Sequence, residues 1–223
     1  DGGGNVRVMS VDKGKETLFA ALRFVNGRTD GPGGALHVRQ ADEGAPEGRV
    51  TIVGCSFEDN TGGRGGAVRV GWRINALVRD SVFRGNDGSG GGDGDRGFSG
   101  GAISTSQDAS EGLRIERCLF EENRGAVAGA VYNILEPVVV TDSVFLDNVA
   151  TQGSGKFFTD GGNTVGPSND PETGEVGEIT LQRLWIEGSV GQEAGGAMLL
   201  WGYPRDAIVL EDGKQVTEFR EGM

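Results

Sequence analysis

The chain has 223 residues, among them 42 glycines and 6 prolines, and it carries a formal net charge of −12. Such an acidic chain is a poor partner for nucleic acid and for anionic membrane surfaces, and its glycines follow no triplet period, which excludes a collagen-like chain. Its apolar runs stay well below the ~18 residues of a membrane helix, so we expect no membrane insertion by this segment.

The N-terminal stretch, residues 1–16, contains one short apolar segment. We expect a strand at residues 6–8 that belongs to the coil beneath the first full repeat. The chain opens with Asp1 and shows no targeting segment. This opening predicts that the sequence is a mature or trimmed segment of a longer protein.

A repeat organised around phenylalanine begins near residue 17. In its clearest copy, 50–70, small or apolar residues precede Phe57 by seven, five and two positions, Asn60 follows by three, and a Gly-Gly-Ala-Val tetrad begins at Gly65. The phenylalanines of the series are Phe24, Phe57, Phe83, Phe120 and Phe145, its asparagines are Asn60, Asn86, Asn123 and Asn148, and its tetrads start at residues 33, 65, 100, 128, 154 and 195. A degenerate sixth copy spans 179–189. Such self-similarity predicts stacked repeats.

Each copy predicts three short strands separated by corners. Positions are counted from the phenylalanine of each copy, so that minus two lies two residues before it and plus one follows it. Apolar residues two apart indicate a strand. The break in this alternation between positions minus five and minus two indicates a bend, with both positions facing inward. The Gly-Gly-Ala step is a second corner, where only small side chains fit between stacked backbones. Coils about 4.8 Å apart then form an all-β, single-stranded, right-handed parallel β-helix, a pectate-lyase-like solenoid of about six to seven coils. We expect one domain over 1–223, with a repeat core at about 17–210.

The inside of this solenoid is predicted to hold ladders of like residues. The phenylalanines form an aromatic stack, and the asparagines form an amide ladder that satisfies the turn backbone. Cys55 and Cys118 occupy the same repeat position on either side of Ser81, so their Cα atoms lie about 9.6 Å apart, beyond the roughly 7 Å reach of a disulfide. We therefore expect two free, buried thiols.

The paired Gly-Gly-Ala-(Ile/Leu/Val) and Phe-x-x-Asn motifs resemble those of the polymorphic outer-membrane protein family of chlamydiae. The resemblance covers residues from about 17 to 200. It implies a right-handed β-helix of the passenger type, displayed at a cell surface. The chain lacks the signal peptide and membrane barrel of a complete family member, so only a passenger-like segment is implied.

Two insertions and two connecting loops are expected between the strands. Residues 37–49 and 71–75 are read as connections, and 86–100 and 159–177 as surface insertions, where binding commonly lies in repeat scaffolds. The first insertion carries a candidate calcium set, Asp87, Asp93 and Asp95. The spacing of these aspartates matches no known calcium loop, and we favour the interpretation that the segment is a flexible acidic loop. Calcium is the one cofactor considered.

The outer face offers candidate binding residues. Positions minus three and plus one carry charges that alternate from coil to coil, which predicts a solvated, mutually paired face. Position minus one is apolar in four successive coils, and such a strip requires cover by an internal loop, which we favour, or by a partner. The aromatic residues near the C-terminal end suit sugar rings, packing under loops, or an interface. The candidate binding residues are Val82, Leu119, Val144, Trp185, Trp201 and Tyr203.

Catalytic signals are weak. Asp59, Glu122 and Asp147 share position plus two, but carboxylates at a corner are ordinary in an acidic β-helix, and the only histidine, His37, lies on an outer face. We expect a non-catalytic, extracellular or cell-surface β-helix, an adhesin, display or assembly subunit that contacts a protein or glycan. The alternative is a polysaccharide-active β-helix enzyme, a lyase, hydrolase or epimerase, with carboxylates converging in one groove.

Overall fold

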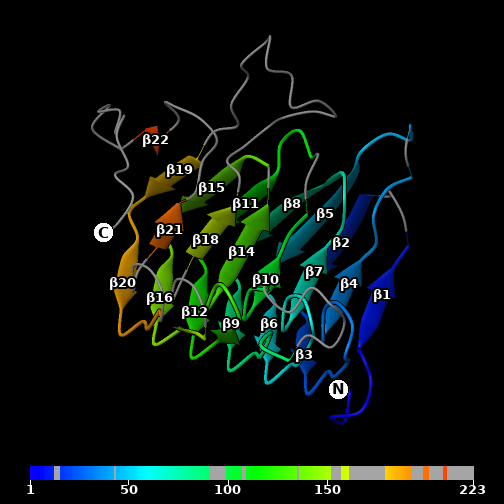
Figure 1. The fold of residues 1–223 in the computed structure, drawn as a ribbon. Coiled ribbons are helices and arrows are strands. Elements are labelled where there is room, and N and C mark those ends of the chain that lie inside the picture. Colours follow the sequence, from blue (N-terminus) through cyan, green and yellow to red (C-terminus); the bar gives the residue numbers. More distant parts are fainter. Residues whose placement is uncertain are drawn as a thin grey trace.

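The protein is a parallel β-helix, as the repeat predicts. The computed structural model describes residues 1–12, 16–42, 44–90, 99–106, 109–134, 136–151, 157–160, 179–191, 198–200 and 208–209. Every strand pairing within these ranges is parallel, and no helix occurs among them. The strands stack rung upon rung from β1 near the N-terminus toward β22 (Figure 1).

Three long sheets and one short sheet form the walls. Sheet A consists of β1 (Met9–Val11), β4 (Leu36–Val38), β7 (Val68–Val70), β10 (Ile103–Ser104), β14 (Val131–Ile134), β18 (Phe157–Asp160) and β21 (Met198–Leu200). Sheet B consists of β2 (Glu16–Ala20), β5 (Gly48–Val53), β8 (Ile74–Arg79), β11 (Leu113–Glu116), β15 (Val138–Thr141), β19 (Ile179–Gln182) and β22 (Ile208–Val209). Sheet C consists of β3 (Arg23–Val25), β6 (Ser56–Glu58), β9 (Val82–Arg84), β12 (Leu119–Glu121), β16 (Val144–Leu146) and β20 (Trp185–Glu187), and the short sheet pairs β13 (Arg124–Gly125) with β17 (Val149–Ala150).

The phenylalanine stack confirms the register of sheet C. Phe57 and Phe83 stack with ring centroids 4.8 Å apart and an interplanar angle of 1°. Phe120 continues the stack above Phe83 at 4.9 Å, and Phe145 follows Phe120 at 4.8 Å. Because one ring per coil repeats at the strand spacing, the aromatic column fixes the vertical alignment of the coils.

The asparagine ladder runs beside the rings and is fully buried. Asn86 Nδ2 donates to Phe57 O and to Asn123 Oδ1, both at 2.9 Å. Asn123 Nδ2 donates in the same way to Phe83 O and to Asn148 Oδ1, both at 2.9 Å. Each amide therefore binds the coil before it and the coil after it, which satisfies backbone groups that would otherwise be buried without partners.

Two columns of left-handed residues form the corners on either side of sheet C. Asp80, Arg117 and Asp142 at position minus three have φ near +51°, and Glu122 and Asp147 at position plus two have φ of 55° and 50°. The first column is the predicted bend. The second was not predicted from the sequence, because non-glycine residues occupy most of its coils. Asx-type and other polar residues tolerate this conformation better than β-branched ones.

The Gly-Gly-Ala corner has the predicted steric cause. Gly65 has φ of 72°, and a Cβ built on it would lie 2.1 Å from Val68 O. A Cβ on Gly66 would lie 2.1 Å from Gly101 O of the next coil. Both positions therefore need glycine, the first for its backbone conformation and the space and the second for the space alone.

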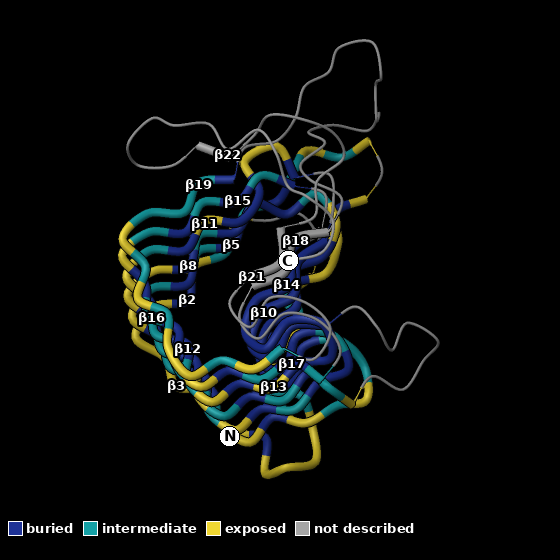
Figure 2. Tube along the Cα trace, turned by 60° about the vertical axis from the view of Figure 1, so that its left-hand side comes forward, coloured by how far each residue is buried: buried dark blue, intermediate teal, exposed yellow. Residues whose placement is uncertain are grey.

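Both cysteines are free and buried, as predicted. They alternate with serines at position minus two: Cys55 N donates to Ser81 Oγ at 3.1 Å, and Cys118 N donates to Ser143 Oγ at 3.1 Å. Burial raises the pKa of the Cys118 thiol to about 12. Seen nearly along the coils, buried residues line the inner wall and exposed residues gather at the corner between sheets B and C (Figure 2).

Three details of the sequence reading are wrong. The first strand is β1, Met9–Val11, rather than 6–8, because its register pairs Met9 with Leu36 of the first tetrad strand. The connections are shorter than 37–49 and 71–75, since β4 reaches Val38 and β5 and β8 begin at Gly48 and Ile74. Leu22 holds the inward-facing position two residues before Phe24, yet it is 42% exposed because it lies in the coil of β2 and β3, the first strands of sheets B and C.

The outer side of sheet A carries a second packed layer. Tyr132, which alternates on β14 with the inward-facing Val131, is fully buried and packs with Ala126, Val127 and Ala128. On the neighbouring rungs Arg69 is 8% exposed and Ser104 is fully buried. The alternation rule separates the two faces of a strand but does not reveal that the chain folds back over one of them.

Candidate functional site

The outer face of sheet C carries the predicted apolar strip. Leu119 pairs with Val82 on one side and Val144 on the other, and Val144 pairs with Trp185. The three aliphatic side chains are half-buried, while Trp185 is 63% exposed. Its indole Nε1–H donates to Glu187 Oε2 at 3.1 Å. The strip is therefore a continuous line of four residues on successive rungs, and its aromatic end is the most exposed to solvent.

One further residue belongs to this surface. Leu146 follows Val144 on β16 at the next outward position, and it is also half-buried. The sequence placed it in the plus-one series, where it is the single apolar member among charged residues. The signal was thus present, but only the structure sets the two columns side by side on one face. We call Val82, Leu119, Val144, Leu146 and Trp185 the sheet C strip.

Ion pairs flank the sheet C strip, as the alternating charges predict. On one side, Arg117 Nε donates to Asp80 Oδ1 at 2.7 Å and Arg183 Nε donates to Asp142 Oδ1 at 2.5 Å. These hydrogen bonds hold the pKa of both aspartates below the ordinary value. On the other side, Arg84 Nε donates to Glu121 Oε2 at 2.6 Å, and on the first two rungs of sheet C Arg23 pairs with Glu58. The arginine of each pair is at least half exposed, so each pair contributes at most about 1 kcal/mol, but together they frame an apolar line with fixed charges.

The remaining aromatic candidates cannot be placed on this surface. The insertion predicted at 159–177 starts later than expected, since residues 159 and 160 are the end of β18. Trp201, Tyr203 and the rest of that insertion, the loop expected to cover the strip, lie outside the described residues. The cover expected from that loop stays a prediction.

The calcium candidates are likewise only partly described. Asp87 pairs across the coils with Thr61 and Arg124, and its Oδ1 accepts hydrogen bonds from Ser89 N at 2.7 Å and Ser89 Oγ at 2.5 Å. Asp93 and Asp95 lie outside the described residues. Within the part of the chain that the structure describes, no group of three or more histidine, cysteine, aspartate or glutamate side chains is arranged to hold a metal ion.

The carboxylates considered for catalysis stand on a convex corner. Asp59, Glu122 and Asp147 are all exposed and share the left-handed turn that follows sheet C. None of them lines the pocket at residues 37–42 or the pocket formed by residues 4–7 and 28–30. A hydrolase would require two carboxyl groups facing each other across a bound sugar, which this arrangement does not provide.

The described part of the chain also holds no helix that is both long and apolar enough for a membrane span.

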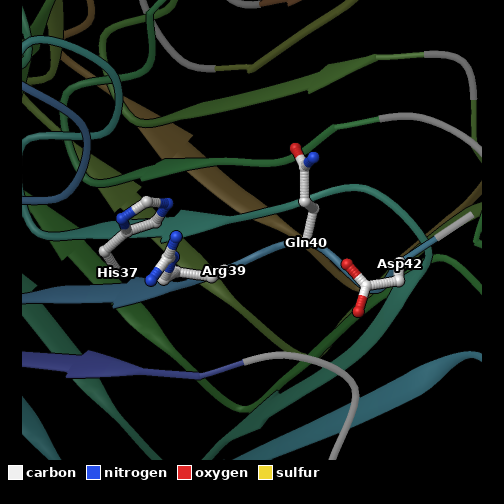
Figure 3. Close-up of a pocket in the computed structure, with 4 residues that line it drawn as sticks. All are labelled: His37, Arg39, Gln40 and Asp42. Atoms are coloured by element: carbon white, nitrogen blue, oxygen red, sulfur yellow. The ribbon is translucent and has the colours of Figure 1, made fainter.

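A polar pocket lies beside the end of β4. It has a volume of about 400 Å³ and is lined by His37, Arg39, Gln40 and Asp42 (Figure 3). The figure shows the imidazole of His37 beside the guanidinium group of Arg39, with Gln40 and Asp42 further along the same segment. Burial, with further contributions from Arg7, Arg69 and Arg39, lowers the pKa of His37 to about 4. Sequence reasoning took this segment for a connecting loop, and no spacing signal marked it.

Comparison of the chain with models of protein families, with curated proteins and with solved structures found no match. The resemblance to chlamydial passenger domains therefore depends on the two repeat motifs, and those motifs have structural roles in this fold.

Proposed function

We propose that the protein is a non-catalytic, extracellular or cell-surface β-helix that displays a rigid binding face to a partner, as an adhesin or as a subunit of a larger assembly. The observation that carries this proposal is the sheet C strip. It sets aliphatic side chains and one exposed indole in line across four rungs, with ion pairs on both sides. An apolar centre framed by charges is the usual anatomy of a protein interface.

Rigidity is the physical basis of the proposed mechanism. The strip is attached to strands whose inner sides carry the stacked rings and the amide ladder, so its side chains keep a constant spacing of one strand from rung to rung. A preformed surface loses little conformational entropy on binding, and weak contacts along the strip add.

The composition of the strip favours a protein partner over a glycan. Aliphatic side chains such as Val82, Leu119 and Val144 bury well against apolar protein surface, whereas sugars stack on aromatic rings, of which the strip has one, Trp185. The enzyme alternative has no comparable support, because the carboxylates in question stand on an exposed corner rather than in a groove.

The test compares two lysine variants of the intact domain. Val82→Lys/Leu119→Lys places two charges in the strip, and Leu77→Lys places one on the outer face of sheet B, where Leu77 is half-buried like Leu119. Circular dichroism and thermal melting check that both variants fold. Pull-down from cell-surface extracts and binding to a glycan array are then measured with each.

The proposal predicts that a partner retained by the wild-type domain is also retained by Leu77→Lys and is lost by the strip variant. It is wrong if the strip variant, correctly folded, retains the same partners with the same affinity. Binding to arrayed glycans alone, lost on Trp185→Ala and kept by the strip variant, would replace the protein partner with a saccharide.

A further inference from the structure

The polar pocket at His37 lies on a different wall of the solenoid from the sheet C strip. It is formed by the end of β4 in sheet A and the residues that follow it, and all four lining side chains are of types that can donate or accept hydrogen bonds. Its volume of about 400 Å³ is within the range of small-ligand sites.

The surroundings of the pocket are positive although the protein is acidic. Arg7, Arg69 and Arg39 all act on the imidazole of His37. Arg7 is fixed in place by neutral acceptors: its Nε donates to Pro32 O at 3.0 Å and to Gly33 O at 2.9 Å. Carbonyl oxygens orient a guanidinium group without cancelling its charge. The field at His37 is therefore that of a cluster of cations.

The third arginine is anchored from the next rung. Arg69, whose strand position pairs with His37, is 8% exposed and donates to Thr105 O and, at 3.1 Å, to Ser106 Oγ. Arg39 is the exposed member of the set: its side chain is 56% exposed, and its contact with Asp12 is a 3.5 Å pair between two exposed groups. Such a pair is weak enough to exchange Asp12 for a ligand carboxylate.

We propose that this pocket binds the carboxylate of an acidic sugar, a uronic acid unit of a polysaccharide or glycan. Arg39 and His37 contact the carboxylate, and Gln40, which both donates and accepts, contacts hydroxyl groups of the ring. Asp42 in the same pocket disfavours polyanions such as phosphate esters by charge repulsion. This selects a singly charged ligand rich in hydroxyl groups.

An exposed aromatic residue on the next rung suits the same ligand. Ala41 N donates to Trp72 O at 3.0 Å, so the turn that carries Trp72 packs against the segment between Gln40 and Asp42. The indole of Trp72 is 43% exposed. Sugar rings stack on such indoles, which makes Trp72 a second contact for a ligand longer than one unit.

The experiment uses the fact that the chain contains a single histidine. The imidazole Cε1–H resonance of the intact domain reports His37 without assignment work. It is followed by NMR during titration with D-glucuronate, with D-glucose as the neutral analogue, and with acetate as the carboxylate without a sugar. The proposal predicts a saturable shift with glucuronate, a raised pKa of His37 in the complex, weaker binding of acetate, and no shift with glucose.

Matched variants test the assignment of residues. Arg39→Gln removes the exposed cation and is expected to weaken glucuronate binding ~five- to tenfold. Arg114→Gln removes an arginine of equal exposure on sheet B, 55% against 56%, and should leave binding unchanged. Asp42→Asn removes the repelling carboxylate and should tighten binding ~two- to fivefold.

Three results would overturn the proposal. They are the absence of a saturable shift with glucuronate, equal affinities for acetate and glucuronate, and equal losses in Arg39→Gln and Arg114→Gln. None of them bears on the sheet C strip, since partner binding there is measured with a separate variant on another face. The two proposals can therefore fail independently.

Discussion

Replacing Asn123 by alanine tests the amide ladder at its centre. Asn123 makes four side-chain hydrogen bonds: Nδ2 donates to Phe83 O and to Asn148 Oδ1 at 2.9 Å each, and Oδ1 accepts from Asn86 N at 3.1 Å and Asn86 Nδ2 at 2.9 Å. All four asparagines of the ladder are fully buried. The substitution thus removes bonds on both neighbouring coils at once.

The expected cost follows from the groups left without partners. The backbone N–H of Asn86 is left without its partner inside the solenoid, which costs about 1–3 kcal/mol, whereas Phe83 C=O loses the bond from the side chain but stays in the ladder between β9 and β12. Asn148 Oδ1 retains the hydrogen bond from the backbone N–H of Asn123 at 3.0 Å, so it adds little. We expect Asn123→Ala to lower the free energy of unfolding by about 3–5 kcal/mol.

The measurement is urea unfolding followed by circular dichroism, with Ser189→Ala as the matched control. Ser189 occupies the ladder position of the last copy but is only half-buried, and its Oγ–H donates to Glu187 O at 3.4 Å. Loss of this hydroxyl group should change the free energy of unfolding by no more than about 0.5 kcal/mol. If Asn123→Ala and Ser189→Ala shift the midpoint equally, the ladder does not stabilise the fold.

Two further predictions concern titratable side chains. The folded state lowers the pKa of His37 from 6.5 to about 4, so the unfolded chain binds more protons between these pH values. The wild-type protein should therefore lose stability relative to His37→Gln as the pH falls through that window. Unfolding midpoints of both proteins at several pH values check this. Burial raises the pKa of Cys118 to about 12 and leaves Cys55 only 2% exposed, so a thiol reagent at pH 8 should label neither cysteine in the native protein and both in urea, and native labelling at the denatured rate would contradict it.

The two proposed sites divide the outer surface of the solenoid by chemistry. Sheet C presents an apolar line that ends in Trp185, and the end of β4 presents a pocket of polar and cationic groups around His37. A β-helix can carry both because its faces point in different directions and share only the buried core. A protein that binds a protein partner on one wall and an acidic glycan on another would use this separation of the two surfaces.

The sequence by itself determined the architecture, because the fold is held by contacts that repeat at one position per coil. The equal positions of Phe57, Phe83 and Phe120 in their copies predict that the rings stack, and the asparagines three residues later predict the amide ladder. The two cysteines are two coils apart by the repeat, which predicts that they do not form a disulfide. Local rules suffice where each residue meets its own counterpart in the next coil.

Only the tertiary structure decided which residues meet outside the repeat. His37 in the pocket feels the charges of Arg7 and Arg69, which come from different coils, and Tyr132 is buried because residues 126–128 pack against it. The second left-handed corner was also hidden, since polar residues adopt it without a glycine at most coils. These features depend on how loops of unequal length return to the solenoid, and loop paths are set by packing rather than by any period in the sequence.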